Sequence, residues 1–237
     1  MTDGQSIDFI LAGGTVTQPI PHTPGAQPAP NPDFDFDWDD IYRGDGSDTG
    51  DPDPLLLAPV DGLTPGLALD LGCGAGGNAL ALAARGWRVT GVDIAPRAIV
   101  STRATASERH LSDLVDLAVA DSAAWQPETT YDFVLSSYSL PPRGPARTAT
   151  LAAALAPGAV LALGEWDEEA CDWGKEDDLV TVDELTEAFT GLGLEIDRAE
   201  RTLVPVHQHP GHEQERGEDH AVIVIARRPH GTLEATL

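Results

Sequence analysis

The fold follows from one stretch, Leu67-Ala68-Leu69-Asp70-Leu71-Gly72-Cys73-Gly74-Ala75-Gly76-Gly77-Asn78. Here an apolar run enters a glycine cluster, and an Ala/Leu-rich run, 79–85, leaves it. A second strand pattern, Val89-Thr90-Gly91-Val92, ends on Asp93. This order predicts a strand, a tight turn, a helix and a second parallel strand, a βαβ unit whose first turn brings backbone close to a ligand. The alternative is a tight turn that binds nothing.

The charges around the turn distinguish between ligand classes. The spacing Gly72-x-Gly74-x-x-Gly77 matches the dinucleotide fingerprint, and Asp93 lies near the ribose position of that fingerprint. However, Asp70 lies two residues before the first glycine, and no Lys or Arg occurs between Arg43 and Arg85. A pyrophosphate would therefore meet a like charge with no cation to offset it. A phosphate-free cofactor with a sulfonium and an ammonium group is favoured instead, and S-adenosylmethionine fits that description.

Several motifs resemble one enzyme family. The run Leu69-Asp70-Leu71-Gly72-Cys73-Gly74-x-Gly76 resembles the first motif of the class I S-adenosylmethionine-dependent methyltransferases. Segments 73–83 and 131–136 are similar to the tellurite-resistance group, and Trp38-x-x-x-Tyr42 resembles the entry segment of the tellurite-resistance and thiopurine methyltransferase subgroups. The tellurite-resistance group usually has Arg where this chain has Gly77, so an arginine that could meet an anionic or oxyanion substrate is missing.

The resemblance implies roles for residues at the carboxyl ends of the predicted strands. Asp70 would hold the methionine amino group, Asp93 would accept from both ribose hydroxyls, and Asp121 with Ser122 would contact the adenine edge. Helix capping is the alternative role for Asp93 and Asp121. The complete set of cofactor-binding candidates is Asp70, Gly72, Gly74, Gly76, Asp93, Ile94, Asp121, Ser122 and Ser136.

Aromatic side chains near the same edge are candidates for the acceptor site. Trp38 and Tyr42 could close over it as a lid, although a short helix packed on the core would use the same pattern. Tyr138 and Trp166, with Trp173, could wall a substrate pocket or simply shield a loop. The substrate and lid candidates are therefore Trp38, Tyr42, Tyr138 and Trp166.

The histidines and Tyr138 are the titratable candidates. Tyr138 and His220 could act in catalysis, but methyl transfer requires mainly orientation of the reactants. His207, His209 and His212 have a spacing that can bind zinc. We favour a solvated loop with incidental histidines, so no metal is predicted.

Composition limits the partners and the compartment. The chain has 14 basic and 39 acidic residues, a net charge of −25, which disfavours nucleic acid and anionic membranes. The run Ser139-Leu140-Pro141-Pro142-Arg143 departs from the pattern of enzymes that methylate bases. The two cysteines, Cys73 and Cys171, indicate no disulfide framework. No apolar run approaches the length of a membrane span. No Lys or Arg precedes Arg43, so the basic start of a secretory signal is not expected. We therefore expect a cytoplasmic monomer or homodimer with a small-molecule substrate.

Strand and helix patterns alternate along the core. This predicts an α/β fold, a doubly wound, mostly parallel seven-stranded sheet with an antiparallel C-terminal hairpin. The domain is expected at 34–230, between a Pro-rich tail, 1–33, and a short tail, 231–237. The expected strands are 66–71, 87–93, 114–120, 131–136, 159–165, 194–206 and 220–228. The expected helices are 76–85, 96–108, 145–155, which ends at Pro157-Gly158, and one capped by Thr181-x-x-Glu184 that ends near Gly191.

The function that follows is methyl transfer from S-adenosylmethionine to a small-molecule nucleophile by in-line displacement, with S-adenosylhomocysteine as product. Two alternatives remain at this point. One is methylation of a protein side chain. The other is a domain that binds S-adenosylmethionine or S-adenosylhomocysteine without catalysing transfer.

Overall fold

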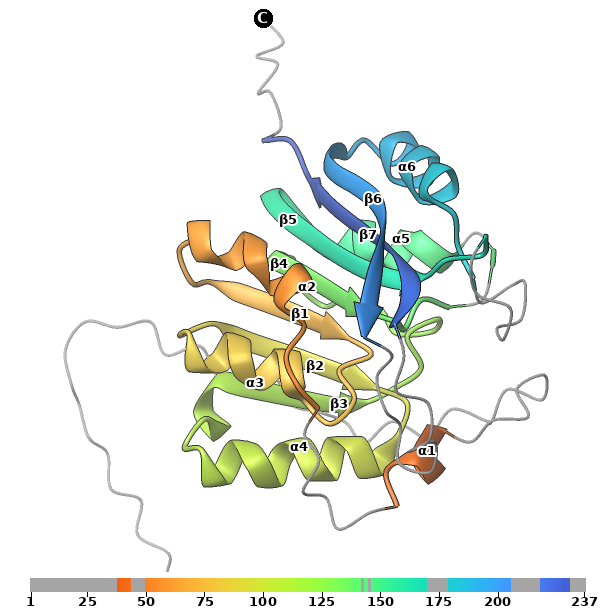
Figure 1. Cartoon of the computed structure of the whole chain (residues 1–237). Helices are drawn as coiled ribbons and strands as arrows, with labels where there is room; N and C mark the ends of the chain where they lie inside the picture. Colours follow the sequence, from red (N-terminus) through yellow and green to blue (C-terminus); the bar gives the residue numbers. More distant parts are fainter. Residues whose placement is uncertain are drawn as a thin grey trace, which may run out of the picture.

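The computed structural model describes residues 38–43, 50–141, 143–144, 146–169, 179–205 and 218–230. Within these ranges the chain forms a seven-stranded sheet in the order β3-β2-β1-β4-β5-β7-β6 (Figure 1). The strands are β1 (Leu67–Leu71), β2 (Arg88–Asp93), β3 (Val115–Val119), β4 (Tyr131–Ser137), β5 (Leu155–Trp166), β6 (Glu195–Pro205) and β7 (Glu218–Arg227). The helices are α1 (Trp38–Ile41), α2 (Pro54–Leu57), α3 (Gly77–Ala84), α4 (Pro96–Glu108), α5 (Ala146–Ala154) and α6 (Val182–Gly191), with 3₁₀ turns at Ala58–Gly62 and Ser112–Leu114.

Helices cover both faces of the sheet. α2, α3 and α4 lie on one face, and α5 and α6 lie on the other (Figure 1). Leu69 of β1 packs in the cluster that contains Leu151 of α5. Its neighbour Ala68 packs in the cluster that contains Leu56 of α2 and Leu82 of α3. Because β1 is buried on both faces, its sequence is a nearly continuous apolar run rather than an alternating one.

The direction of the sheet order reverses at β1. From β1 the chain adds β2 and then β3 on one side, and it then crosses to β4 on the other side. Leu69 accordingly pairs with Thr90 of β2 and with Val134 of β4, both in parallel register. In open α/β sheets, ligands bind outside the carboxyl ends of the strands at such a reversal. The loops after β1, β2 and β4 are therefore the place for a site.

The predicted antiparallel end of the sheet is confirmed. β7 lies between β5 and β6 and runs antiparallel to both, so Val224 faces Leu163 of β5 and Ala199 of β6. β6 and β7 are consecutive among the described elements, and the antiparallel register of the pair is the one expected for two neighbouring strands at the end of the chain.

The prediction for the start of β5 is wrong. The helix was expected to end at Pro157-Gly158, with a strand from 159, but α5 ends at Ala154 and β5 begins at Leu155. Leu155 is fully buried and pairs with Tyr131 of β4. The register shifts between that pair and the next, which accommodates Pro157 and Gly158 inside the strand. Burial of Leu155 therefore overrides the local breaker pattern.

The helix caps agree with the sequence patterns. α4 begins at Pro96, and the Thr181 hydroxyl at the start of α6 accepts a hydrogen bond from the Glu184 N–H at 3.1 Å. The Glu184 carboxylate bonds to Arg143 and Arg147, although a complete capping box would return it to the cap residue. None of the helices that the structure describes has both the length and the apolar character needed to cross a membrane.

Candidate active site

The turn after β1 is tightly packed against two other segments. Gly72, Gly74 and Gly76 have φ values of 77°, 51° and 90°, which side chains rarely adopt. A Cβ on Gly72 would lie 2.1 Å from the Ser139 Cβ, and a Cβ on Gly74 would lie 2.8 Å from the Tyr42 hydroxyl. These positions need glycine for both conformation and space. The same contacts place Tyr42 and Ser139 against the turn.

Asp70 is a buried carboxylate at the start of this turn. Its exposure is 0%, and neither carboxylate oxygen has a hydrogen-bond partner. Burial, and then the nearby charge of Asp93, raises the pKa of Asp70 to about 7, and the Ala79 N–H in the first turn of α3 offsets this only in part. A cationic or hydrogen-bond donor group placed beside this buried carboxylate would therefore be stabilised.

Asp93 connects the end of β2 to the glycine turn. Its Oδ2 accepts from the Gly74 N–H and its Oδ1 from the Ala95 N–H, both at 2.8 Å. Burial raises the pKa of Asp93, and these backbone donors partly offset the effect. The cap residue of α4 is Ala95, so Asp93 does not cap that helix. Each carboxylate oxygen has further lone pairs, and Asp93 can accept additional donors.

The end of β3 lies beside the loop after β4. The Asp121 Oδ1 accepts from the Ala123 N–H at 2.8 Å and closes a turn, and the next element is β4 rather than a helix. The Ser122 hydroxyl is 3.5 Å from the Ser139 carbonyl oxygen. The end of strand β3 therefore lies at the same edge of the sheet as the ends of β1, β2 and β4.

A serine pair joins β4 to β1. Ser136 is fully buried, and its hydroxyl lies 3.0 Å from the Ser139 hydroxyl, which donates to the Leu71 carbonyl oxygen at 2.6 Å. The turn that carries Ser139 is thereby held against the end of β1. This arrangement fixes the position of Tyr138, which lies between the two serines in sequence.

Tyr138 and Trp166 form a stacked aromatic pair. Their ring centroids are 4.4 Å apart with an interplanar angle of 29°. Tyr138 has a φ of 53°, uncommon for a bulky side chain, and its N–H donates to the Gly164 carbonyl oxygen at 2.8 Å. Burial, and then the charges of Asp53 and Glu165, raises the pKa of the Tyr138 hydroxyl well above its usual range.

The predicted lid segment lies across the start of α4. The Asp39 carboxylate in α1 accepts from the Arg97 N–H at 2.7 Å and pairs with the Arg97 guanidinium. Tyr42, one turn later, reaches Gly74, whereas Trp38 has an exposure of 37%. The segment thus brings Tyr42 to the glycine turn and leaves Trp38 half exposed.

Ile94 and His220 occupy different surroundings. Ile94 follows Asp93 and is 40% exposed at the edge of the site. His220 is half buried in β7, and its carbonyl oxygen accepts from the Asp167 N–H at 3.1 Å. Ala221 packs in the apolar cluster that includes Tyr138, so strand alternation places the His220 side chain on the opposite face. The structure does not bring the two catalytic candidates together.

Two residues of the site were not predicted. Ser139 connects β4 to β1, as described above. Glu165 is 4% exposed, and its carboxylate accepts from the Leu140 N–H and the Trp166 N–H, both at 3.0 Å. An acid at the end of the apolar run of β5 was the pattern that could have identified Glu165. Trp173, Cys171 and the histidines 207, 209 and 212 lie outside the described residues.

The sheet order and the glycine turn together define an α/β domain of the type that binds a nucleoside cofactor at its carboxyl edge. Residues 68–158 match the family described as a methyltransferase domain. A trans-aconitate 2-methyltransferase from Streptomyces avermitilis is 31% identical over 181 residues, which cover 65% of this chain and 67% of that protein. The chain belongs to the class I S-adenosylmethionine-dependent methyltransferases of the small-molecule type. It is an enzyme, and its cofactor is S-adenosylmethionine.

Solved structures agree with this assignment. A structure from work on the conversion of a disulfide bond into a thioacetal group during echinomycin biosynthesis has a TM-score of 0.63 and 28% identity, covering 83% of this chain and 92% of that one. TehB from Haemophilus influenzae has a TM-score of 0.63 and 20% identity, covering 73% of this chain and 61% of that one. These structures confirm the predicted fold class, and the family match and the relative described above confirm the predicted family and cofactor.

Proposed function

We propose that this methyltransferase holds its cofactor between Asp70, the glycine turn and Asp93, and its acceptor at the Tyr138–Trp166 pair. The observation that carries the proposal is the Asp70 carboxylate, which is fully buried with no hydrogen-bond partner on either oxygen. A cofactor with an ammonium group supplies the missing donor. A pyrophosphate would add negative charge to a site that already contains Asp70 and Asp93.

The residues present fit the cofactor along its length. Asp70 receives the methionine ammonium, directly or through water, and the backbone at Gly72, Gly74 and Gly76 passes close to it. Asp93 accepts from the ribose hydroxyls with the lone pairs that the Gly74 and Ala95 N–H groups leave available. The half-exposed Ile94 packs against the base, Asp121 and Ser122 meet its polar edge, and Ser136 supports the loop beside the reacting end.

The chemistry requires orientation more than acid or base catalysis. The bound cofactor supplies an electrophilic methyl group on a sulfonium. The chain aligns the acceptor nucleophile with that group and excludes water, and alignment of two reactants can contribute about 7–11 kcal/mol to lowering a barrier. Tyr138, fixed by Ser139 and stacked on Trp166, defines the acceptor side. The α1 segment, with Trp38 and Tyr42, covers the cofactor from the outside.

The surface charge of the enzyme limits its partners. With a net charge of −25, the surface repels phosphate groups, so we assign neither nucleic acid nor an anionic membrane as a partner. The acceptor is then a diffusing small molecule met in the cytoplasm, and the enzyme acts as a monomer or homodimer. Size-exclusion chromatography with light scattering measures the oligomeric state.

The proposal is tested by calorimetry and mass spectrometry. S-adenosylmethionine and S-adenosylhomocysteine should bind with one-to-one stoichiometry, and NAD should not bind. A panel of small molecules incubated with enzyme and S-adenosylmethionine should yield at least one product heavier by one methyl group. Tight NAD binding, or cofactor affinity that is unaffected in both Asp70→Asn and Asp93→Ala, would overturn the proposed site.

A further inference from the structure

Two buried carboxylates flank the aromatic pair. Asp53 is 6% exposed and Glu165 is 4% exposed, and the charges of both act on the Tyr138 hydroxyl. The Asp53 Oδ1 accepts from the Leu55 N–H at 2.8 Å and caps α2, and Glu165 accepts from two backbone N–H groups. These hydrogen bonds fix the orientation of both carboxylates, and their charges reach the Tyr138 hydroxyl.

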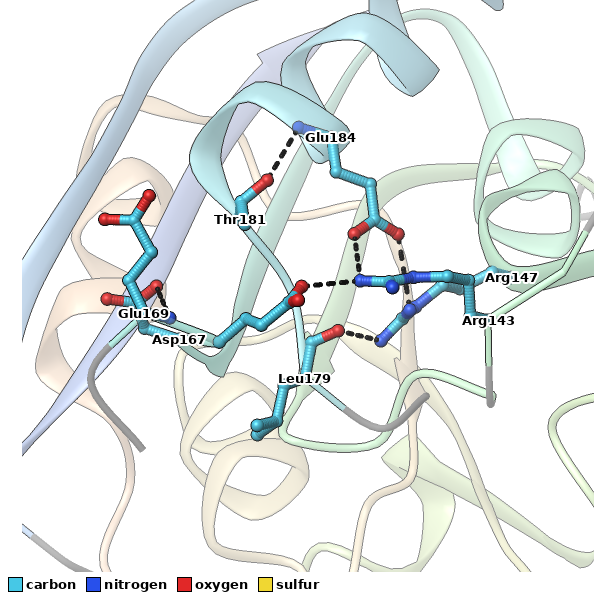
Figure 2. A network of polar contacts seen from close by, with 8 residues as sticks. Arg143, Arg147, Asp167, Glu169, Leu179, Thr181 and Glu184 are labelled. Atoms are coloured by element: carbon cyan, nitrogen blue, oxygen red, sulfur yellow. Dashed lines mark hydrogen bonds and ion pairs between the residues drawn. The ribbon is translucent and has the colours of Figure 1, made fainter. Parts of the chain in front are cut away.

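The arginines that follow Tyr138 in sequence are already paired with acids. The Arg143 guanidinium pairs with Glu168 at 2.7 Å and with Glu184 at 2.9 Å. Figure 2 shows Glu184 facing both Arg143 and Arg147. Arg147 is 3% exposed and bonds to Glu184 at 3.3 Å and to the Leu179 carbonyl oxygen at 3.0 Å. To bind an acceptor anion, either arginine would have to give up a carboxylate that is already partly removed from water.

The other basic side chains at this edge show the same pairing in the described part of the chain. Their partners lie on the lid and on the loop after β5. Arg43 pairs with Asp40, Arg97 with Asp39, and Arg201 with Asp167 and Glu169. Position 77, at the start of α3, cannot supply a cation either, because a Cβ on Gly77 would lie 2.8 Å from the Gly50 carbonyl oxygen.

From these observations we infer the charge class of the acceptor, an inference that rests on the proposed function. The acceptor is a planar molecule, and the part of it that contacts the Tyr138–Trp166 pair is neutral or cationic. Carboxylates and other anions do not bind there. An anion at the ring pair would lose its hydration beside two fixed negative charges. A cation or a neutral ring gains contact with the Tyr138 and Trp166 faces. Trans-aconitate, named for the Streptomyces avermitilis relative, belongs to the rejected class.

The test uses three planar probes of similar shape and different charge, benzamidine, benzamide and benzoate. Each is titrated into the full chain saturated with S-adenosylhomocysteine, and tryptophan fluorescence and calorimetry give its dissociation constant. Benzamidine should bind at least about tenfold more tightly than benzoate, with benzamide between them. Asp53→Asn, which retains an oxygen to cap α2, should reduce that ratio by about threefold or more. Asp61→Asn is the control, because Asp61 is an exposed carboxylate away from the ring pair, and it should leave the ratio of the benzoate and benzamidine dissociation constants unchanged.

The outcomes separate this inference from the proposed function. Failure of S-adenosylhomocysteine to bind would contradict the proposed function itself. If S-adenosylhomocysteine binds and benzoate binds as well as benzamidine, the cofactor site stands and the charge selection is overturned. The selection is overturned equally if none of the three probes binds up to its solubility limit, or if Asp61→Asn changes the ratio as much as Asp53→Asn does.

Discussion

Asp39 and Arg97 fasten the α1 segment, the proposed lid, to the start of α4. The Asp39 carboxylate accepts from the Arg97 N–H at 2.7 Å, and the Arg97 guanidinium bonds to the Asp39 carbonyl oxygen at 3.2 Å. That N–H lies in the first turn of α4, where helix donors have no partner within the helix. The contact therefore stabilises both the helix end and the position of Tyr42 over Gly74.

Loss of this contact should loosen the lid. Asp39→Ala removes a charge-assisted acceptor, an interaction of about 1.5–3 kcal/mol when well formed and less at an exposed site. We expect the dissociation rate of S-adenosylhomocysteine to rise by about threefold to tenfold, with a smaller change in the association rate. Stopped-flow fluorescence measures both rates. Asp40→Ala is the matched control because Asp40 is 3.9 Å from Arg97, and an equal effect of both variants would contradict the role of Asp39.

Asp70 should make stability and cofactor affinity respond to pH in opposite directions. Its pKa of about 7 in the folded, cofactor-free protein lies above the ordinary value of 3.8. The folded state therefore binds this proton more tightly than the unfolded state does. The contribution of Asp70 to stability rises as pH falls from above 7 toward 4, and the ionised form is destabilising above pH 7. If Asp70 binds the cofactor ammonium as proposed, cofactor binding needs the ionised carboxylate and should weaken below pH 7.

Asp70→Asn isolates both effects. Without cofactor, the variant should melt at a higher temperature than wild type at pH 8, and the difference should shrink as pH falls toward 4. With S-adenosylmethionine present, wild type should gain more in melting temperature than the variant at pH 8. Differential scanning fluorimetry across pH measures both. A cofactor-free difference that is independent of pH would contradict the buried, unpartnered state of Asp70.

Asp93 should be essential for cofactor affinity. Asp93→Ala removes the acceptor of two backbone N–H groups and the proposed acceptor of the ribose hydroxyls. We expect the dissociation constant of S-adenosylmethionine to rise by about tenfold or more. Calorimetry well below the melting temperature measures it, and Asp113→Ala at the exposed 3₁₀ turn Ser112–Leu114 is the control. An unchanged dissociation constant would remove Asp93 from the ribose site.

The sequence was informative wherever a local pattern determined the structure. The apolar run before Gly72 and the acid that ends β2 predicted two neighbouring strands and the turn between them. The proline that begins α4 and the threonine before α6 predicted where those helices begin. Each of these features depends on residues within a few positions of one another, so a single sequence contains the necessary information.

Tertiary contacts determined what the sequence did not reveal. Leu155 enters the sheet because Tyr131 lies beside it, and no local pattern around Pro157 indicates that pairing. Ser139 and Glu165 acquire their roles from the carbonyl of Leu71 and the N–H of Leu140, which are distant in sequence. The partners of a buried polar group depend on the fold, and a motif gives no information about them.

His220 offers a test of whether a general base is needed. Its side chain lies on the opposite face from the cluster that includes Tyr138. We expect His220→Ala to keep kcat/KM within about twofold for an acceptor found in the mass-spectrometric panel, whereas loss of a general base costs about 100-fold or more. Cofactor affinity, measured in parallel, verifies that the site is intact. A large drop in kcat alone would assign His220 to catalysis.

Gly74 and Tyr42 should be energetically coupled if the lid lies over the glycine turn. Gly74→Ala introduces a Cβ 2.8 Å from the Tyr42 hydroxyl at a φ of 51°. The alanine at this left-handed position costs about 1–2 kcal/mol of backbone strain, which does not depend on Tyr42. The steric clash with the Tyr42 hydroxyl does depend on Tyr42. Tyr42→Phe removes the hydroxyl, and the next Tyr42 atom is 3.8 Å away, an ordinary contact.

A double-mutant cycle measures this coupling. Gly74→Ala should weaken S-adenosylhomocysteine binding strongly, and the double variant with Tyr42→Phe should recover part of the loss, a coupling of about 0.5–3 kcal/mol. Tyr42→Phe alone should have a small effect. Because backbone strain remains, recovery should be incomplete. Strict additivity of the two single changes would mean that Tyr42 does not contact the turn in solution, and would remove the basis for treating α1 as a lid.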